Sequence, residues 1–344
     1  MDEGLTYKDA GVDIEAQDRA IGAFQEAVRA THTPNVVTGL SDFGGMFALG
    51  GGYQDPILVA GTDSVGTKLM IAFELDRHDT IGQDAVAMCV DDIVCQGARP
   101  LFFLDYLGSG VRDPEQTAAI VIGVANACRQ VGCALIGGEL AELPGLYKPG
   151  EYDLVGFAVG VVERSRIIDG SAVSAGDILL GLSSSGVHSN GLSLARKALL
   201  QVGGLKLSDT PCELDRSVGE ELLTPTRLYA ASIMAALDAG LSPGAIVHIT
   251  GGGLPDNVIR CLPEGLSAHI RVDGFPHQPI FGLIQRLGGV ADAEMYRTFN
   301  MGVGMVVVCR PEAAEALEAN FAASGETVYR IGEIERGDRQ VRLS

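Results

Sequence analysis

The feature that most constrains the fold is an apolar run that opens into a glycine-rich, charged loop. Residues 57–60 are all apolar, and Gly61-Thr62-Asp63-Ser64-Val65-Gly66-Thr67-Lys68 follows them without a break. A short apolar run of this kind predicts a buried strand. Backbone N–H groups can approach a phosphate at glycine because no Cβ stands in the way. The stretch therefore predicts a strand that leads into a phosphate-binding loop.

Asp63 and Lys68 give this loop the charges that a nucleoside triphosphate needs. A carboxylate can hold Mg²⁺, and a lysine can neutralise phosphoryl charge. The spacing differs from the motif G-x-x-x-x-G-K-[ST], because Thr67 separates Gly66 from the lysine. We therefore expect an ATP site of a different architecture, against the alternative that both charges are merely solvated.

A second carboxylate motif follows at Asp91 and Asp92, in the pattern D-x4-G-A-x-P. Helical periodicity predicts a helix with one buried face over about residues 80–98. Neighbouring residues on a helix point about 100° apart, so only one of the two carboxylates should face an ion. We assign that position to Asp92. The apolar positions that carry this prediction are Val86, Val90, Ile93 and Gly97.

Six further segments, taken in order with these two motifs, resemble one family from end to end. The resemblance is to the aminoimidazole ribonucleotide synthetase (AIR synthetase) superfamily of ATP-dependent enzymes, and within it to the ligases that close an imidazole ring. The segments are Tyr7–Ile14, Phe102–Tyr106, Gly137–Glu139, Ser183–Gly191, His248–Gly253 and Met295–Asn300.

The resemblance implies a reaction and a set of partners. Phosphoribosylformylglycinamidine would be closed to 5-aminoimidazole ribonucleotide in purine biosynthesis, with ATP giving ADP and phosphate. Phosphorylation of the amide oxygen would create a leaving group, and the neighbouring amidine nitrogen would attack the same carbon. The resemblance also implies Mg²⁺, and a homodimer in which the N-terminal sheets of two chains form a barrel beside C-terminal α/β sandwiches.

Periodicity independently predicts an α/β (α+β) protein with two domains, divided at the turn-rich residues 165–176. We expect an arm with a glycine-rich loop over 1–50, an ATP-binding domain over 51–165 and a C-terminal domain over 175–344. The strands expected are 57–62, 101–107, 133–137, 153–162, 178–183, 245–249, 267–272, 303–309 and 327–334. The helices expected are 18–31, 80–98, 114–131, 190–202, 225–239, 254–261, 279–287 and 311–323.

The expected nucleotide site combines the loop, the arm and three carboxylates. Asp63 and Lys68 are expected to take part in catalysis, and Asp63, Asp92 and Glu139 to hold one or two Mg²⁺ ions. The alternative for the carboxylates is capping or turn formation. The glycine-rich loop of the N-terminal arm either closes over the nucleotide or is a surface turn. Residues expected at ATP and its phosphates are Lys8, Asp13, Gly44, Gly45, Gly61, Thr62, Ser64, Gly66, Thr67 and Asp92.

Two turns are expected to hold the second substrate, because serine hydroxyls and helix N-termini bind phosphate well. His188 either transfers a proton or holds phosphate, unless it only forms a hydrogen bond within its turn. Asn257 is either a substrate contact or a plain surface residue. The residues expected at this substrate are Ser185, Ser189, Asn190, Gly251, Gly252, Gly253 and Asn257.

Composition excludes several other classes of protein. The net charge of −19 argues against a nucleic-acid surface, and no apolar run approaches the ~20 residues of a membrane span. The seven cysteines lack metal-type spacing, and the first residues lack a secretory signal. We therefore expect a cytoplasmic protein with no nucleic-acid or membrane partner.

Three residues depart from the pattern that the resemblance leads us to expect. Ser64 stands for glycine, Asp91 for asparagine and Leu140 for threonine. They favour one alternative, a regulatory subunit that binds nucleotide without turnover. The other alternative is a selenophosphate synthetase, a thiamine-monophosphate kinase or a hydrogenase-maturation dehydratase. The first of these needs an N-terminal reactive cysteine or selenocysteine, whereas the first cysteine here is Cys89.

Overall fold

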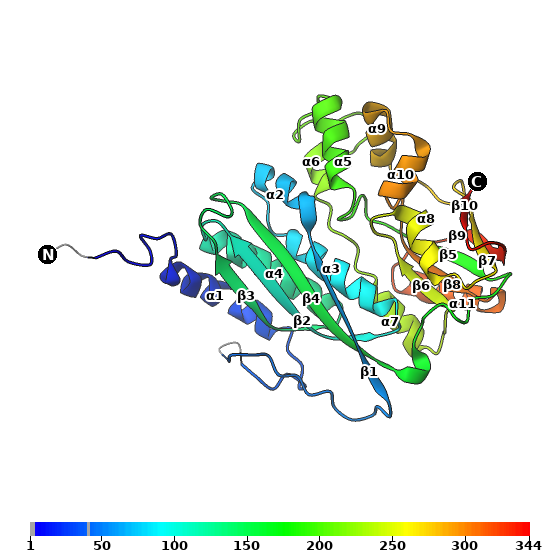
Figure 1. Ribbon diagram of the computed structural model, residues 1–344, viewed down its shortest axis with the longest axis horizontal. Coiled ribbons are helices and arrows are strands. Elements are labelled where there is room, and N and C mark those ends of the chain that lie inside the picture. The colour runs from blue at the N-terminus through cyan, green and yellow to red at the C-terminus, as the bar shows by residue number, and fades with distance from the viewer. Residues whose placement is uncertain (1–3, 40–41) are drawn as a thin grey trace.

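The computed structural model describes residues 4–39 and 42–344 and contains two sheets side by side along the long axis (Figure 1). The first sheet has the strand order β1-β4-β2-β3, in which β2 and β3 are parallel and the other pairs are antiparallel. Its strands are β1 (Pro56–Ser64), β2 (Arg99–Ser109), β3 (Ala134–Glu142) and β4 (Tyr152–Glu163).

Helices cover one face of this sheet, where they pack on the apolar residues of alternate strand positions. Helix α3 (Ile81–Val94) lies against β1 and β4, α4 (Pro114–Gln130) lies beside α3, and α1 (Ile14–Arg29) packs on α4. Asp13 caps α1 by accepting a hydrogen bond from the Ala16 N–H. A 3₁₀ turn, Gly66–Lys68, leads from β1 into the short helix α2 (Leu69–Leu75).

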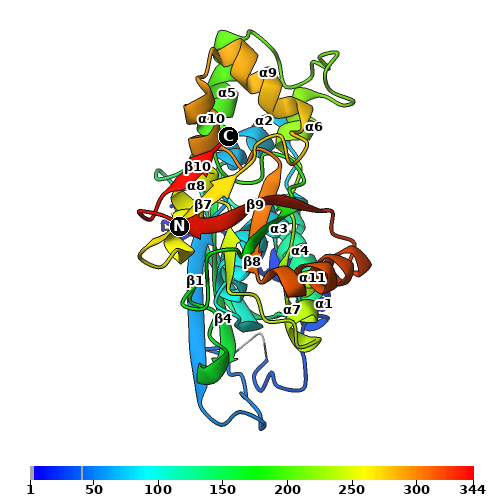
Figure 2. The ribbon, with the colours of Figure 1, turned by 90° about the vertical axis from the view of Figure 1, so that its right-hand side faces the viewer.

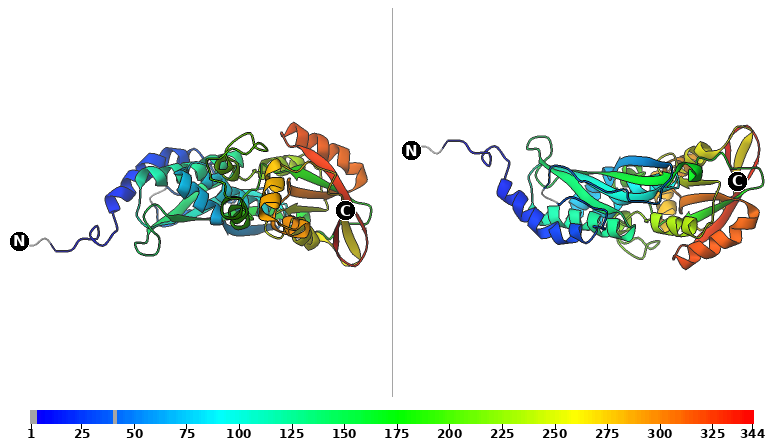
Figure 3. Two further views of the ribbon diagram at one scale, coloured as in Figure 1. Left: turned by 90° about the horizontal axis from the view of Figure 1, so that it is seen from above. Right: turned by 90° about the horizontal axis from the view of Figure 1, so that it is seen from below.

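The opposite face of the first sheet is open. Leu58, Phe157 and Tyr106 lie on it, because their cross-strand partners alternate with the residues that face α3. Their exposed fractions are 62%, 39% and 37%. Views from above and below show α1 and α4 on the other side of the strands (Figure 3). Apolar side chains on an uncovered sheet face mark a surface for association.

The second sheet has the order β10-β7-β9-β5-β8-β6 and lies at the other end of the molecule (Figure 2). All seven residues of its strand β8 are buried. Its strands are β5 (Ile178–Ser183), β6 (Ala245–His248), β7 (Leu266–Ile270), β8 (Val303–Cys309), β9 (Val328–Arg336) and β10 (Val341–Leu343). Its helices are α5 (Leu192–Arg196, continued by a π-helical turn to Val202), α6 (Val218–Leu222), α7 (Ala230–Asp238), α8 (Gly253–Val258), α9 (Pro279–Gly288), α10 (Asp292–Thr298) and α11 (Pro311–Ala323).

The prediction of two α/β domains is confirmed, with differences in detail. The short elements α2, α6, α10 and β10 were not predicted, since a few residues carry little periodicity. The helix expected over 225–239 begins only at Ala230, because residues before it have no regular structure and form hydrogen bonds to side chains of α3. Among the described residues, every helix is too short or too polar to cross a membrane.

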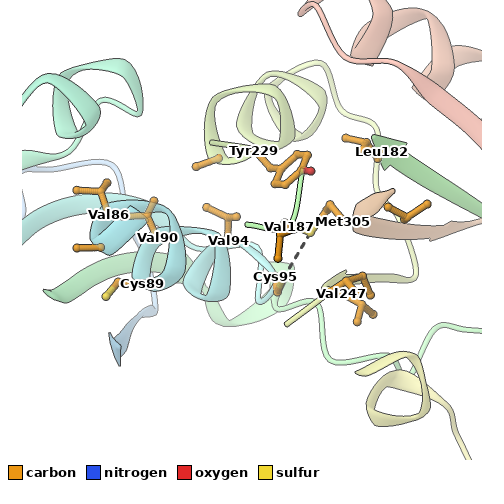
Figure 4. Close-up of a cluster of buried hydrophobic side chains, with 14 of the residues drawn as sticks. Val86, Cys89, Val90, Val94, Cys95, Leu182, Val187, Tyr229, Val247 and Met305 are labelled. Atoms are coloured by element: carbon orange, nitrogen blue, oxygen red, sulfur yellow. Dashed lines mark hydrogen bonds between the residues drawn. The ribbon is translucent and has the colours of Figure 1, made fainter. Parts of the chain in front are cut away.

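Helix α3 joins the two halves through a shared apolar core (Figure 4). Val90, Val94 and Cys95 face Val187 and Met305 of the C-terminal half, and all five side chains are buried. The Cys95 Sγ lies 3.9 Å from the Met305 Sδ. Burial of one such side chain is worth about 1.5 to 3 kcal/mol, so this contact holds the halves together strongly.

Gly82 allows α3 and α4 to cross closely, and its replacement tests that packing. An added Cβ would stand 2.1 Å from the Val124 backbone nitrogen, so backbone must move. We expect Gly82→Ala to lower the free energy of unfolding by about 2 to 3 kcal/mol. Gly22→Ala on α1 is the control, because its Cβ meets nothing within 4 Å. It should stabilise by about 0.5 to 1 kcal/mol. Urea unfolding measures both, and equal effects would contradict this packing.

Asp105 of β2 is a buried carboxyl on the helix-covered face, and burial raises its pKa from 3.8 to about 7. The folded protein thus keeps a proton that the unfolded chain releases. Stability should fall as pH rises from about 4 to 7, by up to about 1.4 kcal/mol per unit, and level off above. Asp105→Asn mimics the protonated carboxyl and should remove this slope. Unfolding curves for both proteins at pH 5, 6, 7 and 8 check it, and parallel pH profiles would refute it.

Candidate active site

Asp63, Asp92 and His248 form the charged centre of the candidate site. Asp63 lies at the end of β1, Asp92 near the end of α3, and His248 at the end of β6. The His248 Nδ1 lies 2.8 Å from the Asp92 Oδ1. Burial raises the pKa of Asp63, and the negative charge of Asp92 raises it further. The site therefore concentrates negative charge where the two halves of the chain meet.

The surroundings of His248 favour its positively charged form. Burial by itself would lower the pKa of His248, but the hydrogen bond to Asp92 and the charges of Asp91, Asp92 and Asp63 raise it above its ordinary value. The imidazole is almost fully buried, whereas Asp92 is half exposed. An imidazolium in this place would hold Asp92 in one orientation and leave its outer oxygen free for a cation.

The glycine-rich loop after β1 (residues 61–68, the nucleotide loop) lies against residues 183–191 of the C-terminal half, here called the serine-rich turn. The Ser189 hydroxyl donates to the Val65 carbonyl at 2.9 Å, and the Thr67 and Ser193 hydroxyls lie 3.0 Å apart. Gly66 has a φ of +70°, a backbone conformation that glycine adopts easily and other residues rarely do, and there is open space around it. The two segments expected to bind different substrates are thus neighbours.

The glycine turn after β6 joins the same group. The Gly251 N–H donates to the Asn190 Oδ1 at 3.1 Å, which ties this turn to the serine-rich turn. Asn257 is buried, and its Nδ2 donates to the carbonyls of Thr250, Gly251 and Gly253. The alternative of a plain surface residue is therefore corrected, because the Asn257 amide is buried and shapes the turn, whereas the expected substrate contact by Asn257 stays a prediction. Gly252 and Gly253, with φ of +97° and +59°, complete that turn.

A cavity of about 210 Å³ opens beside Asp92 and His248, between the end of α3, strand β6 and the end of α8. Asp92, His248 and Asn257 line it together with the cationic side chain of Arg260. Each half of the chain thus contributes polar groups to one hollow. This arrangement suits a ligand with phosphate or other anionic groups more than an apolar ligand.

The structure corrects the expected role of Lys68 at a phosphate. The side chain is fully buried, and its Nζ lies 2.7 Å from the Asp84 Oδ1 and 2.6 Å from the Thr224 carbonyl. Burial lowers the pKa of Lys68, although the charge of Asp84 opposes this effect. Lys68 therefore pairs inside the protein and does not face the cleft.

The expected catalytic role of His188 is also corrected, in favour of the alternative of a hydrogen bond within its turn. The imidazole is buried, and its Nε2 accepts from the Ser185 N–H at 3.1 Å. Burial lowers the pKa of His188 well below its ordinary value, and His248, Lys68 and Arg227 lower it further. Ser185 in turn donates its hydroxyl to the Pro225 carbonyl at 2.6 Å. Both side chains shape the turn.

Glu139 does not join Asp63 and Asp92 at one ion. Strand β3 forms the other edge of the sheet, separated from β1 by β4 and β2. Glu139 pairs in register with Tyr106, on the open face, whereas Asp63 pairs with Gly156, on the helix-covered face. Among the described residues, no group of three or more carboxylate, histidine or cysteine side chains stands ready to hold a metal.

The expected arm residues also lie at the β3 edge. Lys8 and Asp13 form an ion pair at 2.8 Å, and the Asp13 N–H donates to the Glu142 Oε2 at the end of β3. Gly45 lies against β3, since an added Cβ would meet Ile136 at 2.8 Å, whereas Gly44 has open space around it. Residues 40–41, in the glycine-rich loop of the arm, lie outside the described residues, so the expected role of that loop as a lid stays a prediction.

Other loop residues can act only through their backbone or from the open face. Gly61 lies against α3, where an added Cβ would stand 3.4 Å from the Cys89 carbonyl oxygen. The Thr62 hydroxyl donates to the Gly156 carbonyl at 2.8 Å. Ser64 pairs with Val155 of β4 on the open face, and its N–H donates to the Asp63 Oδ1 at 2.7 Å. This last bond orients the Asp63 carboxylate.

His248 is a site residue that the sequence does not predict, although its segment contributes to the family resemblance. The available signal is its position as the last residue of an apolar strand, directly before Ile249-Thr250-Gly251-Gly252-Gly253. Side chains at the ends of strands often line binding sites in α/β folds.

Comparison with protein families identifies both halves of the chain. Residues 48–162 match the N-terminal domain of AIR synthase related proteins, and residues 174–343 match their C-terminal domain. Two solved structures share the fold at low identity. Thiamine-monophosphate kinase from Stenotrophomonas maltophilia has a TM-score of 0.69 at 19% identity, covering 94% of this chain and 96% of that one. Hydrogenase maturation protein HypE in complex with ATP has a TM-score of 0.70 at 19% identity, covering 97% and 93%.

Much higher identity links the chain to named relatives. A phosphoribosylformylglycinamidine cyclo-ligase of Gloeobacter violaceus is 53% identical, over 96% of this chain and 97% of the relative. Another, of an Anaeromyxobacter species, is 54% identical over 97% and 96%. Identity at this level over almost the full length of both chains shows common family membership, and the chain belongs to the phosphoribosylformylglycinamidine cyclo-ligases of the AIR synthase related proteins.

Proposed function

We propose that the chain closes phosphoribosylformylglycinamidine to 5-aminoimidazole ribonucleotide with consumption of ATP. The observation that carries this proposal is the meeting of the glycine-rich loop, the serine-rich turn and the glycine turn around Asp63, Asp92 and His248. Named relatives above 50% identity support the substrate, and the ATP complex of a structural neighbour supports a nucleotide. The cytoplasm is the compartment we propose, since all seven cysteines are free thiols.

The protein's task in this reaction is positioning. The amide oxygen of the substrate must lie in line with the γ-phosphate, and the amidine nitrogen must then reach the same carbon. The backbone N–H group of the loop at Gly66 suits a phosphate oxygen, since an added Cβ there would meet nothing within 4 Å. In the turn at Gly251–Gly253, Gly251 already donates to the Asn190 Oδ1 and Gly253 to the Thr250 carbonyl. Asn190 sets the distance between the two turns through its bond to Gly251.

Asp63 and Asp92 fit a divalent cation. Burial raises the pKa of Asp63, the charge of Asp92 raises it further, and a cation between the two carboxylates would favour their charged forms. Carboxylate oxygens are the ligands that Mg²⁺ prefers, and Mg²⁺ usually takes only one or two of them beside phosphate oxygens and water. When bound, Mg²⁺ would neutralise phosphoryl charge. Because Lys68 is buried in an ion pair with Asp84, it cannot neutralise phosphoryl charge, and the cation would have to do so.

Asp92→Asn tests this assignment. Loss of the carboxylate charge should lower kcat at least about 100-fold, because the cation that offsets phosphoryl charge loses a ligand. ADP and the diazo-coloured aminoimidazole product are measured together, with and without phosphoribosylformylglycinamidine. Asp338→Asn, at an exposed carboxylate in the loop between β9 and β10, is the matched control and should leave kcat unchanged.

The wild-type protein separates the alternatives in the same assay. ADP and aminoimidazole in equal amounts support the cyclo-ligase. ADP without aminoimidazole would move the substrate elsewhere in the superfamily. Nucleotide binding without ADP would favour the regulatory subunit, and full activity of Asp92→Asn would remove Asp92 from the site.

We also propose that two copies pair through the open face of the first sheet. The apolar residues Leu58, Phe157 and Tyr106 lie there, and Glu139 lies on the same face. Lys8 and Asp13 stand at the adjoining β3 edge, on an arm that projects away from its own chain (Figure 1). Burial of this face would cover the apolar side chains and give the arm a neighbour.

Leu58→Lys tests the dimer. Placing a charge in an apolar interface should raise the dimer dissociation constant at least about 10-fold. Val202→Lys is the control, because Val202 is 60% exposed and Leu58 is 62% exposed, but Val202 lies in the C-terminal half. Sedimentation over a range of concentrations measures both variants. A monomeric wild-type protein, or equal weakening by both variants, would overturn this interface.

A further inference from the structure

Residues 224–226, here called the strap, connect α6 to α7 and are held by the N-terminal half of the chain. The Lys68 Nζ donates to the Thr224 carbonyl at 2.6 Å. The Asp84 Oδ1 accepts from the Thr226 N–H at 2.8 Å and from the Thr226 hydroxyl at 2.7 Å. Lys68, Asp84 and Thr226 are each 0% exposed. Lys68 and Asp84 of the N-terminal half thus hold this short segment through three buried hydrogen bonds.

The strap is also bonded to the serine-rich turn on its other side. The Ser185 hydroxyl donates to the Pro225 carbonyl at 2.6 Å, between the two strap residues that the N-terminal half holds. Ser185 belongs to the serine-rich turn, and so does Ser189, whose hydroxyl donates to the Val65 carbonyl of the nucleotide loop. The strap therefore bridges the two segments proposed to bind the two substrates.

Further bonds fix the strap along α3. The Gln83 Nε2 donates to the Thr226 carbonyl at 2.8 Å, and the Asp91 Oδ1 accepts from the N–H groups of Tyr229 and Ala230 at 3.0 Å. Most of these bonds reach the backbone, so they fix the path of the chain whatever its side chains are. This path replaces the first part of the helix that the sequence predicts over 225–239.

A buried ion pair is a costly way to gain stability, because both charges lose their hydration. Apolar side chains of similar size would often serve stability equally well. What the pair of Lys68 and Asp84 adds is geometry, since charge-assisted hydrogen bonds of 2.6 to 2.8 Å tolerate little displacement. Lys68 is the last residue of the glycine-rich loop, so that geometry extends to the nucleotide site.

We propose that the strap is a positioning element that couples the nucleotide loop to the serine-rich turn. Binding of ATP at the nucleotide loop would then hold the serine-rich turn in the position that binds the second substrate. Binding of the second substrate would in the same way favour ATP, because both segments are bonded to adjacent residues of the strap. Thr226 is the positioning residue that links the strap to the ion pair of Lys68 and Asp84. This inference rests on the proposed function for the identity of the two ligands.

Thr226→Val is the direct test, since valine keeps the shape and the backbone N–H but removes the hydroxyl that donates to Asp84. Binding of a non-hydrolysable ATP analogue is measured by calorimetry with and without phosphoribosylformylglycinamidine. In the wild-type protein each ligand should tighten the other at least about 5-fold. In Thr226→Val this factor should fall below about 2-fold, and kcat should fall about 10-fold with a smaller change in KM for ATP.

Two further variants separate positioning from general stability. Thr226→Ser keeps the hydroxyl and should restore the coupling. Thr224→Val is the matched control, because the Thr224 hydroxyl donates to the Glu220 carbonyl of α6 and not to the N-terminal half. It should keep both coupling and kcat. Should Thr226→Val not fold, Ser185→Ala breaks the other side of the strap and should reduce the coupling in the same way.

The outcomes are distinguishable from a failure of the proposed function. Wild-type protein that binds both ligands with coupling but forms no aminoimidazole would refute the cyclisation and leave the strap supported. Unchanged coupling in both Thr226→Val and Ser185→Ala would overturn the strap. So would failure of Thr226→Ser to restore the coupling, or equal loss in Thr224→Val. Two ligands that bind the wild-type protein without affecting each other would overturn it as well.

Discussion

The arrangement of this protein depends on helix α3, which is buried between the two halves of the chain. Its apolar side chains, with Cys95 directly after its last turn, pack on the C-terminal half, and the Cys95 Sγ contacts the Met305 Sδ. Its carboxylates supply the alignment, because Asp84, Asp91 and Asp92 each meet a polar partner from the C-terminal half. A buried polar group without its partner would cost about 1 to 3 kcal/mol or more, so a shifted docking of the halves is penalised at the buried Asp84 and Asp91 and, through the buried His248, at Asp92. Apolar contact alone would leave that docking far less defined.

The same helix explains how a chain with a net charge of −19 can hold polyanionic substrates. Two carboxylates at the candidate site, Asp63 and Asp92, repel phosphate until a cation lies between them. The lysine nearest in sequence, Lys68, is withdrawn into the domain contact. Under the proposed function, the attraction for phosphate would come from a bound cation, from the cationic side chain of Arg260, from His248 and from the backbone N–H of Gly66. Such a site would bind nucleotide together with a metal ion, and overall charge matters little because it is screened within about 10 Å at ordinary ionic strength.

The sequence predicted the parts of the site that depend on local pattern and missed those that depend on partners far along the chain. Asp63 and Asp92 were predictable, because each stands at the end of an element with clear periodicity. The direction of Lys68 was not, since it is decided by Asp84 and Thr224, and Thr224 lies in a segment that periodicity assigns to the start of a helix. The separation of Glu139 from Asp63 and Asp92 was not predictable for another reason. Strand order and the face on which a residue lies cannot be read from a single strand, and here they place Glu139 on the far edge and the open face.

The three departures from the family pattern lose their weight once their surroundings are known. Asp91 uses one oxygen, Oδ1, to accept two backbone N–H groups at the start of α7, and asparagine would offer the same acceptor. Burial raises the pKa of Asp91 to about 7, so near neutral pH this carboxyl carries less negative charge than an ordinary aspartate. Ser64 lies on the open face of β1 and serves Asp63 only through its backbone N–H. Leu140 packs against the apolar core. Each departure leaves Asp63, Asp92 and His248 intact, and the regulatory alternative is thereby left without the residues that favoured it.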